Sequence, residues 1–264
     1  MVVVQIAATS GRSCVKLLES LAYSSLWVAG AAAALTAAAS QGMGVALSGP
    51  VLGLVFCGTL VVYNVDRLRD LPQDFATAPL RSAFVRRHRT GLRGLVVVAL
   101  AGSFVLARVL DPPALGALGV VAALGLLHRR LKRFALWKPF YVSAAWVVVC
   151  VGVPALQGEC PAHVGWVAAV IGLSILANVI ASNLRDGEAV MAAWGAQMPL
   201  RVARGVAASG VALALLAPGP LRPLLTVPLA TAAALGPFRA DERYGLLVVD
   251  GALWLGALGA LALG

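Results

Sequence analysis

The chain carries little charge for its length. Of its 264 residues only 12% are charged, 11 are Asp or Glu, and 60% are hydrophobic, with a mean hydropathy of +0.89. A water-soluble domain of this size does not need so much apolar surface, so the composition excludes a soluble enzyme and indicates an integral membrane protein. Long apolar stretches recur throughout, which predicts a single transmembrane domain over residues 1–264.

Cysteine and histidine are scarce as well. The four cysteines show no paired spacing and two of them fall within apolar stretches, so we interpret them as small core residues. The three histidines do not form a ligand set by spacing. These patterns disfavour a metal or redox centre built from these residues, which are Cys14, Cys57, Cys150, Cys160, His88, His128 and His163.

The apolar stretches predict an all-α, polytopic membrane protein with nine transmembrane helices. Each candidate span has about 17 to 23 residues, near the length that a bilayer requires. Polar or Pro/Gly-rich segments separate the spans. The predicted spans are 18–39, 44–65, 93–110, 112–128, 138–156, 163–183, 202–217, 221–237 and 245–263.

The basic residues are distributed unevenly between the two ends of these spans. Of the 21 Lys and Arg residues, two precede the first span, and only Arg108 and Arg222 lie on the opposite side from the rest. By the positive-inside rule, the N-terminus and the loops after the even-numbered spans face the cytoplasm. We expect the protein to lie in the cell inner membrane. The net charge of +10 therefore meets lipid headgroups of the bilayer, and no nucleic-acid partner is predicted.

Three of the acidic residues share one spacing. Asp66, Asp70 and Asp74 follow the second span at four-residue intervals. A four-residue step on a helix is about 400°, so Asp66 and Asp70 lie on one face, about 6 Å apart along the axis. Asp74 extends this stripe if the helix continues through Pro72. Neighbouring carboxylates at the end of a membrane helix repel each other unless cations hold them together.

A second polar cluster follows the sixth span, on the same predicted side. It combines two amides with two acids: Asn178, Asn183, Asp186 and Glu188. Two acidic clusters on one membrane face predict a divalent-cation site, because Mg²⁺ binds through a few carboxylates together with the phosphates of a substrate. The alternative interpretation of the first cluster is a solvated helix end whose aspartates pair with Arg67 and Arg69.

Two basic segments accompany these clusters. Segment 77–89 contains Arg81, and segment 128–139 contains Arg130, Lys132 and Lys138. Most such residues serve only as membrane anchors. Beside a carboxylate–metal site, however, Arg can grip phosphate oxygens bidentately and Lys can act as a point charge. Arg and Lys beside a metal site would together stabilise the negative charge that builds up on a departing pyrophosphate.

The chain resembles the UbiA superfamily of intramembrane prenyltransferases. Members have nine transmembrane helices with Asp-rich motifs after helices two and six, where they bind a prenyl pyrophosphate through Mg²⁺ and transfer the prenyl group to an acceptor. Here the resemblance is carried by residues 64–74, by 183–188, and by segments 131–133 and 137–139. It implies a single bundle around a central cavity that is reached from the lipid side.

Both motifs depart from the family pattern. The first, NDxxDxxxD in the family, fits in two registers: either Asp66 and Asp70 are its second and third acids, or Asp66 stands at the Asn position with Asp70 and Asp74 as the later acids. In the second motif Asp186 matches, but Asn183 replaces the leading Asp. The second motif therefore offers fewer acids to a metal than the family pattern does.

The resemblance implies ionisation of a prenyl pyrophosphate to an allylic carbocation within a dry cavity. The implied metal ligands are Asp66, Asp70, Asp74, Asp186 and Glu188, and the implied catalytic residues are Asp66, Asp70, Asp186 and Lys132. The implied substrate-binding residues are Asn64, Arg67, Arg81, Arg130, Lys138, Asn183, Tyr63 and Tyr141.

Asp250 lies well inside the ninth predicted span, away from its ends. A carboxylate there costs free energy, so we expect it to face the bundle interior. Asp241 and Glu242, in contrast, are interpreted as ordinary loop charges. Aromatic residues can stabilise a carbocation through their ring faces, but core packing or interface anchoring is the more common role of such residues. The candidates are Tyr63, Trp137, Tyr141 and Trp146.

Prenyl transfer to a lipophilic small-molecule acceptor is the predicted reaction. The first alternative is a terpene cyclase of the same superfamily, in which the double bonds of the substrate capture the cation. The second is a membrane transporter that uses the same acids to bind ions. A transporter would place charges near the bilayer midplane, whereas the acids here, apart from Asp250, cluster at span ends.

Overall fold

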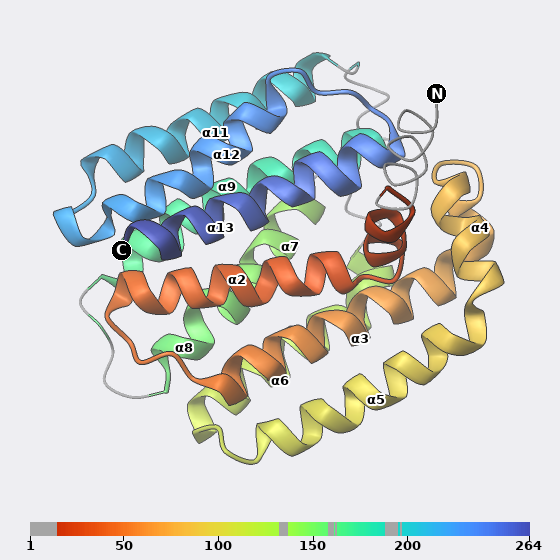
Figure 1. Cartoon of the computed structure of the whole chain (residues 1–264), viewed down its shortest axis with the longest axis horizontal. Helices are drawn as coiled ribbons and strands as arrows, with labels where there is room; N and C mark the ends of the chain where they lie inside the picture. The colour runs from red at the N-terminus through yellow and green to blue at the C-terminus, as the bar shows by residue number, and fades with distance from the viewer. Residues whose placement is uncertain (1–14, 132–136, 158–160, 162, 188–194, 196) are drawn as a thin grey trace, which may run out of the picture.

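The computed structural model is an all-helical bundle (Figure 1). It describes residues 15–131, 137–157, 161, 163–187, 195 and 197–264, and no β-strand occurs within these ranges. A first helical segment covers Val15–Tyr23. The elements that follow are α2 (Leu26–Met43), α3 (Gly49–Asp74), α4 (Pro79–Arg87), α5 (Arg89–Ala107), α6 (Pro112–Leu131), α7 (Lys138–Val147), the π-helix η1 (Val148–Gly152), α8 (Val153–Ala155), α9 (Val164–Arg185), α11 (Gln197–Leu216), the 3₁₀ helix η2 (Gly219–Leu225), α12 (Thr226–Leu235), the π-helix η3 (Tyr244–Val249) and α13 (Asp250–Leu263).

Six helices in the described ranges are long and apolar enough to cross a membrane, and the first, bent helix makes a seventh if its two pieces form one span. The six are α3, α5, α7 with η1 and α8, α9, α11, and η3 with α13. Two predicted spans are not among these six: α6, of which Pro112–Gly125 counts as a shorter apolar helix within the described residues, and the short pair η2 and α12. A multi-pass membrane protein is therefore supported, while the count of nine and the central cavity stay predictions.

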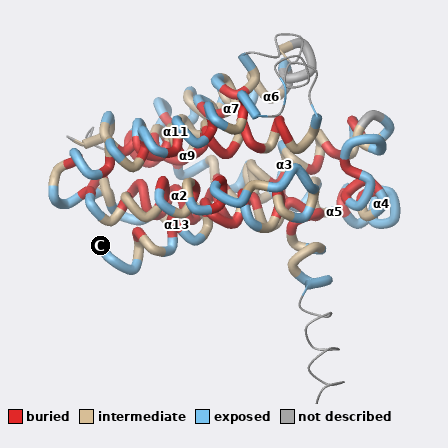
Figure 2. Tube along the Cα trace, turned by 90° about the horizontal axis from the view of Figure 1, so that it is seen from above, coloured by how far each residue is buried: buried red, intermediate tan, exposed pale blue. Residues whose placement is uncertain are grey.

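Small residues allow the central helices to pack closely. α2 buries a run of alanines, among them Ala31, Ala32 and Ala38, and packs against α13 and α3. Small side chains let helix backbones approach one another in a membrane protein. At Gly256 a Cβ atom would lie 2.5 Å from the Cα atom of Val227, so the contact between α13 and α12 needs glycine there. Figure 2 shows the buried positions along these central helices.

The first helix is broken, although the sequence predicted a continuous span over 18–39. Its two pieces, Val15–Tyr23 and α2, meet at 77°. Ser25, between them, has a φ of 66°, the left-handed conformation in which many helices end. The break leaves the last carbonyl groups of the first piece without donors from their own helix.

Two side chains of α3 donate to these carbonyl groups. Arg67 Nη1 donates to the carbonyl oxygens of Ala22 at 2.9 Å and Tyr23 at 2.7 Å. Asn64 Nδ2 donates to the carbonyl oxygen of Ser24 at 3.0 Å. Both side chains are buried. Because the carbonyl end of a helix carries partial negative charge, a cation is favoured there. These hydrogen bonds from α3, the helix that carries the first acidic motif, stabilise the break in the first helix.

The stripe of acids continues through the proline. α3 includes Pro72 and ends at Asp74, so Asp66, Asp70 and Asp74 lie on one helix. The helix begins at Gly49, after Ser48, whose hydroxyl accepts from the Val51 amide at 3.5 Å. The helix therefore begins five residues after the start of the predicted span 44–65 and continues nine residues beyond its end.

Replacing the buried guanidinium should weaken the whole bundle. We expect Arg67→Ala to lower the free energy of unfolding by about 2–3 kcal/mol, because two charge-assisted hydrogen bonds at a buried helix end are lost. Denaturant unfolding in detergent measures this. Arg69→Ala, on the exposed side of the same helix, is the matched control, and equal losses for the two variants would contradict this role of Arg67.

Candidate functional site

The two acidic motifs lie at the same end of the bundle. We call it the motif end and define it as residues 63–87, 178–187 and 241–250. Arg81, on α4, joins the two motifs. Its Nη2 atom pairs with Asp74 Oδ2 of the first motif at 2.9 Å, and its charge also acts on Asp186 of the second motif. One cation thus serves two segments that are separated by more than a hundred residues. Figure 1 shows α4 beside the end of α3.

Arg81 is positioned by Glu242, which the sequence had assigned to an ordinary loop. The Glu242 carboxylate accepts from the backbone amides of Leu80 at 3.0 Å and Arg81 at 2.6 Å, in the first turn of α4. The first amides of a helix have no partners in their own helix, and a carboxylate there is stabilised by the helix dipole. Asp241 has a similar role, because its Oδ1 accepts from the Tyr244 amide at 2.8 Å. Both assignments as plain loop charges were wrong.

The second motif holds a buried ion pair. Arg185 donates from Nε to Asp186 Oδ1 at 2.8 Å and from Nη2 to Oδ2 at 3.1 Å. The two side chains are 7% and 26% exposed. Burial alone would raise the pKa of Asp186, but Arg185, together with Arg81 and Lys138, outweighs burial and holds this pKa below its ordinary value. Asp186 is therefore ionised and surrounded by three cations.

Asp250 brings the last helix into the site. Asn178 Nδ2, on α9, donates to Asp250 Oδ1 at 3.2 Å and to the carbonyl oxygen of Val249 at 3.0 Å. The Asp250 charge also acts on Arg185 and Arg67. The carboxylate is thus drawn toward the other charged groups of the motif end. It begins α13, directly after the π-helix η3, and such π-helical turns are frequent at functional sites.

An aromatic pair lies next to these charges. The ring of Tyr63, on α3, packs edge-to-face on Trp146 of α7, with centroids 6.3 Å apart. Asp250 and Asp66 lie near the Tyr63 hydroxyl group. Trp137 is different, because 68% of its surface is exposed and its ring packs on Phe140, as expected of an interface anchor.

The other predicted site residues divide into three groups. Asn64 and Arg67 are occupied by the break in the first helix. Five lie at or near the motif end, with Asp70 and Asn183 buried and the rest partly buried: Asp66, Asp70, Lys138, Tyr141 and Asn183. Lys132 and Glu188 lie outside the described residues, as does the side chain of Arg130.

Three residues of the motif end were missed as site residues by the sequence reasoning: Arg185, Glu242 and Gly245. Arg185 had a signal, because it directly precedes the predicted ligand Asp186. Gly245 had none. A Cβ atom there would overlap the Arg185 side chain and lie 2.7 Å from its Nη1 atom, so the absence of a side chain makes room for the guanidinium.

The two motifs differ in how they suit Mg²⁺. Within the described part of the chain, no three His, Cys, Asp or Glu side chains are grouped closely enough to hold a metal together. Mg²⁺ can use one or two carboxylates plus phosphate oxygens, and Asp66 and Asp70, one turn apart on α3, fit that donor set. Asp74 and Asp186 form ion pairs with arginine, and Asp66 and Asp70 also have interaction partners within the protein.

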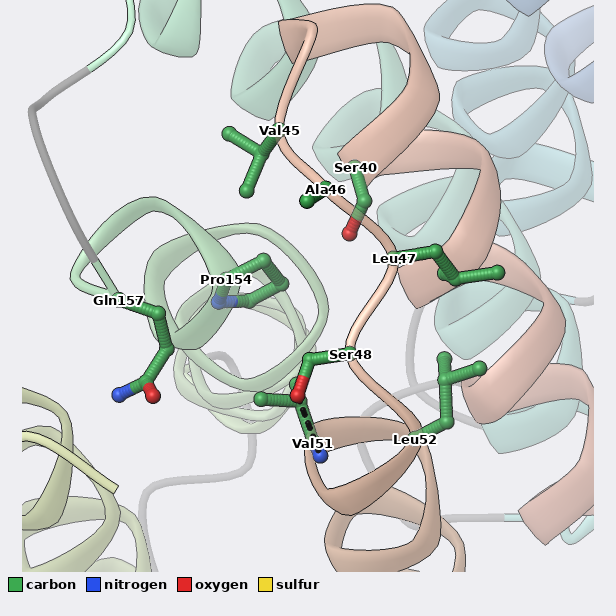
Figure 3. Close-up of a pocket in the computed structure, with 9 residues that line it drawn as sticks. All are labelled: Ser40, Val45, Ala46, Leu47, Ser48, Val51, Leu52, Pro154 and Gln157. Carbon is green, nitrogen blue, oxygen red and sulfur yellow. Dashed lines mark hydrogen bonds between the residues drawn. The ribbon is translucent and has the colours of Figure 1, made fainter. Parts of the chain in front are cut away.

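Two cavities lie away from this site. One, of about 240 Å³, lies at the opposite end of the bundle, between the loop after α2, the start of α3, and α8 (Figure 3); its lining includes Ser40, Val45, Ser48, Pro154 and Gln157. The other, of about 360 Å³, is an apolar groove between α7 and α9 that includes Phe140, Val147 and Gly172. Neither is lined by a residue of the acidic motifs.

Comparison with protein-family models, curated proteins and solved structures found no match. The function is therefore argued from the chemistry of the motif end itself.

Removing the Glu242 carboxylate should loosen α4. We expect Glu242→Ala to reduce stability by about 1 kcal/mol, because two amides of the first turn of α4 lose their acceptor. Hydrogen exchange of the amides of residues 79–87 should become faster. Arg239→Ala, an exposed change in the same loop, provides the comparison. Unchanged exchange in α4 of Glu242→Ala would show that the carboxylate does not position Arg81.

Proposed function

We propose that this chain is a UbiA-type intramembrane prenyltransferase, which uses Mg²⁺ to move a prenyl group from a prenyl pyrophosphate to a lipophilic acceptor. The observation that carries the proposal is the position of Arg81, which pairs with Asp74 of the first motif and acts on Asp186 of the second. It supports the view that two distant acidic segments form one site, as binding of a polyanion through cations requires.

The charges of the motif end suit a pyrophosphate. Arg81, Lys138 and Arg185 supply positive charge around Asp186, and Arg and Lys are the side chains that bind phosphate oxygens. Asp66 and Asp70 would hold Mg²⁺, which would neutralise the pyrophosphate and favour its departure. The acidic and basic side chains thus have separate roles, because the carboxylates hold the metal and the cations bind the leaving group.

The reaction proposed is an alkyl transfer. The C–O bond of the donor breaks, and its electron pair leaves with the pyrophosphate, where the cationic side chains take up the charge. The allylic carbon then bonds to a nucleophilic carbon of the acceptor, which loses a proton. Tyr63 and Trp146, packed on each other beside Asp250, present aromatic surface that could stabilise the allylic cation.

The remaining features of the proposal concern the membrane. The six or seven candidate spans support a multi-pass protein, and we propose that α6 and the η2–α12 pair complete a nine-helix bundle. The excess of Lys and Arg at the motif end supports an orientation with this end on the cytoplasmic side of the cell inner membrane. The prenyl chain and the acceptor would enter from the lipid into a cavity between the helices.

Turnover should require the first motif. With prenyl pyrophosphates of several chain lengths, candidate lipophilic acceptors and Mg²⁺, the protein in nanodiscs should release pyrophosphate, and Asp70→Asn should reduce the rate about 10²-fold or more, since a charge that holds the metal is lost. Asp111→Asn, an exposed acid at the other end of the bundle, should leave the rate unchanged.

The same assay separates the alternatives. Product analysis without any acceptor should yield no hydrocarbon or terpene alcohol. Formation of such a product in an Asp70-dependent manner would replace the transferase by a terpene cyclase. Pyrophosphate release that is absent for all donors, or insensitive to Asp70→Asn, would contradict both enzymes and favour an ion-binding membrane protein.

A further inference from the structure

Arg185 is bound to Asp186 in a way that leaves little of that carboxylate for a metal. Both oxygen atoms of Asp186 accept from the guanidinium, at 2.8 and 3.1 Å. A planar guanidinium that meets a carboxylate with two parallel hydrogen bonds forms one of the strongest side-chain pairs in proteins. Mg²⁺ would have to compete with Arg185 for the lone pairs of these two oxygen atoms.

The surroundings of Arg185 are built to keep it in place. Its side chain is only 7% exposed, and Gly245 makes room for it on η3, where any side chain would overlap the guanidinium. Glu242 adds negative charge near it. A buried cation is tolerated when it is paired in this manner, and removal of one partner is strongly unfavourable. The guanidinium is therefore a fixed part of the site.

One nitrogen atom of the Arg185 guanidinium can still donate a hydrogen bond to an anion. The buried Nη1 atom has no hydrogen-bond partner among the residues that the structure describes. A buried donor without a partner costs free energy, which an oxygen atom of a bound ligand or a water molecule would recover. A phosphate oxygen suits a guanidinium in both charge and geometry.

We infer that Arg185 supplies the positive charge that a second Mg²⁺ would otherwise bring, so that the site works with one divalent cation, held by Asp66 and Asp70. This inference rests on the proposed function, because it assigns a pyrophosphate to the motif end. Asp186 is then a partner of Arg185 and not a metal ligand.

The number of bound metal ions tests this inference. Mn²⁺ replaces Mg²⁺ as the probe, and the full chain in nanodiscs is saturated with a prenyl thiopyrophosphate and desalted; the retained Mn²⁺ is released by acid and counted by electron paramagnetic resonance. We expect one ion per chain in the wild type and in Asp186→Asn, against the two of a two-metal site. Arg185→Gln should raise the count to two, because Asp186 becomes available as a ligand.

Two further variants separate charge from structure. Arg185→Lys keeps the cation and should retain a count of one. Arg243→Gln removes an arginine of the same end that pairs with Glu19 instead, and it should also retain one. If Arg185→Gln does not fold, the wild type, Asp186→Asn and Arg185→Lys still decide the question.

A count of two in the wild type that falls to one in Asp186→Asn would overturn the inference while leaving the proposed prenyltransferase intact. A wild-type protein that retains neither Mn²⁺ nor the thiopyrophosphate, and releases no pyrophosphate from any donor, would overturn the proposed function and this inference together.

Discussion

The structure depends on pairing charge at helix ends that are withdrawn from water. A carbonyl group or a carboxylate that is buried without a partner costs free energy, and the membrane offers few alternative partners. Arginine satisfies this need repeatedly. Arg67 donates to the buried carbonyl groups where the first helix breaks, and Arg185 pairs with the Asp186 carboxylate where α9 ends. These two arginines of the motif end therefore each have a structural role of their own.

The same constraint shapes the candidate site. Asp74 and Asp186 are balanced by Arg81 and Arg185 within the protein. Asp66 and Asp70 lie one helical turn apart on the same face of α3. Under the proposed function, a site with few acids would serve a highly charged substrate because the arginines would contribute positive charge that metal ions otherwise bring.

The sequence predicted the parts of this arrangement that depend on local pattern. The helical bundle follows from the apolar spans, and the stripe of Asp66, Asp70 and Asp74 follows from a four-residue period that survives Pro72. Asp250 was expected to face the interior, and it accepts from Asn178 of α9. To predict these features, it is enough to know the period of a helix and the free-energy cost of burying a charge in a membrane.

Contacts between distant segments could not be predicted in this way. The hydrogen bond from Arg67 to Ala22 joins residues 45 positions apart, and that from the Arg81 amide to Glu242 joins residues 161 positions apart. Neither the break at Ser25 nor the space at Gly245 leaves a local pattern, because each depends on which helix packs against it. For this reason Glu242 was interpreted as a loop charge, and the need for glycine at position 245 was missed.

A structure of the protein in nanodiscs with Mg²⁺ and a prenyl thiopyrophosphate would show directly whether the two acidic motifs form one pyrophosphate site. We expect the pyrophosphate between the ends of α3 and α9, with Mg²⁺ on Asp66 and Asp70. Arg81 and Lys138 should lie close to the phosphate oxygens, and the prenyl chain should run toward Tyr63. A ligand bound at the other end of the bundle, or a metal bound away from α3, would contradict the proposed site.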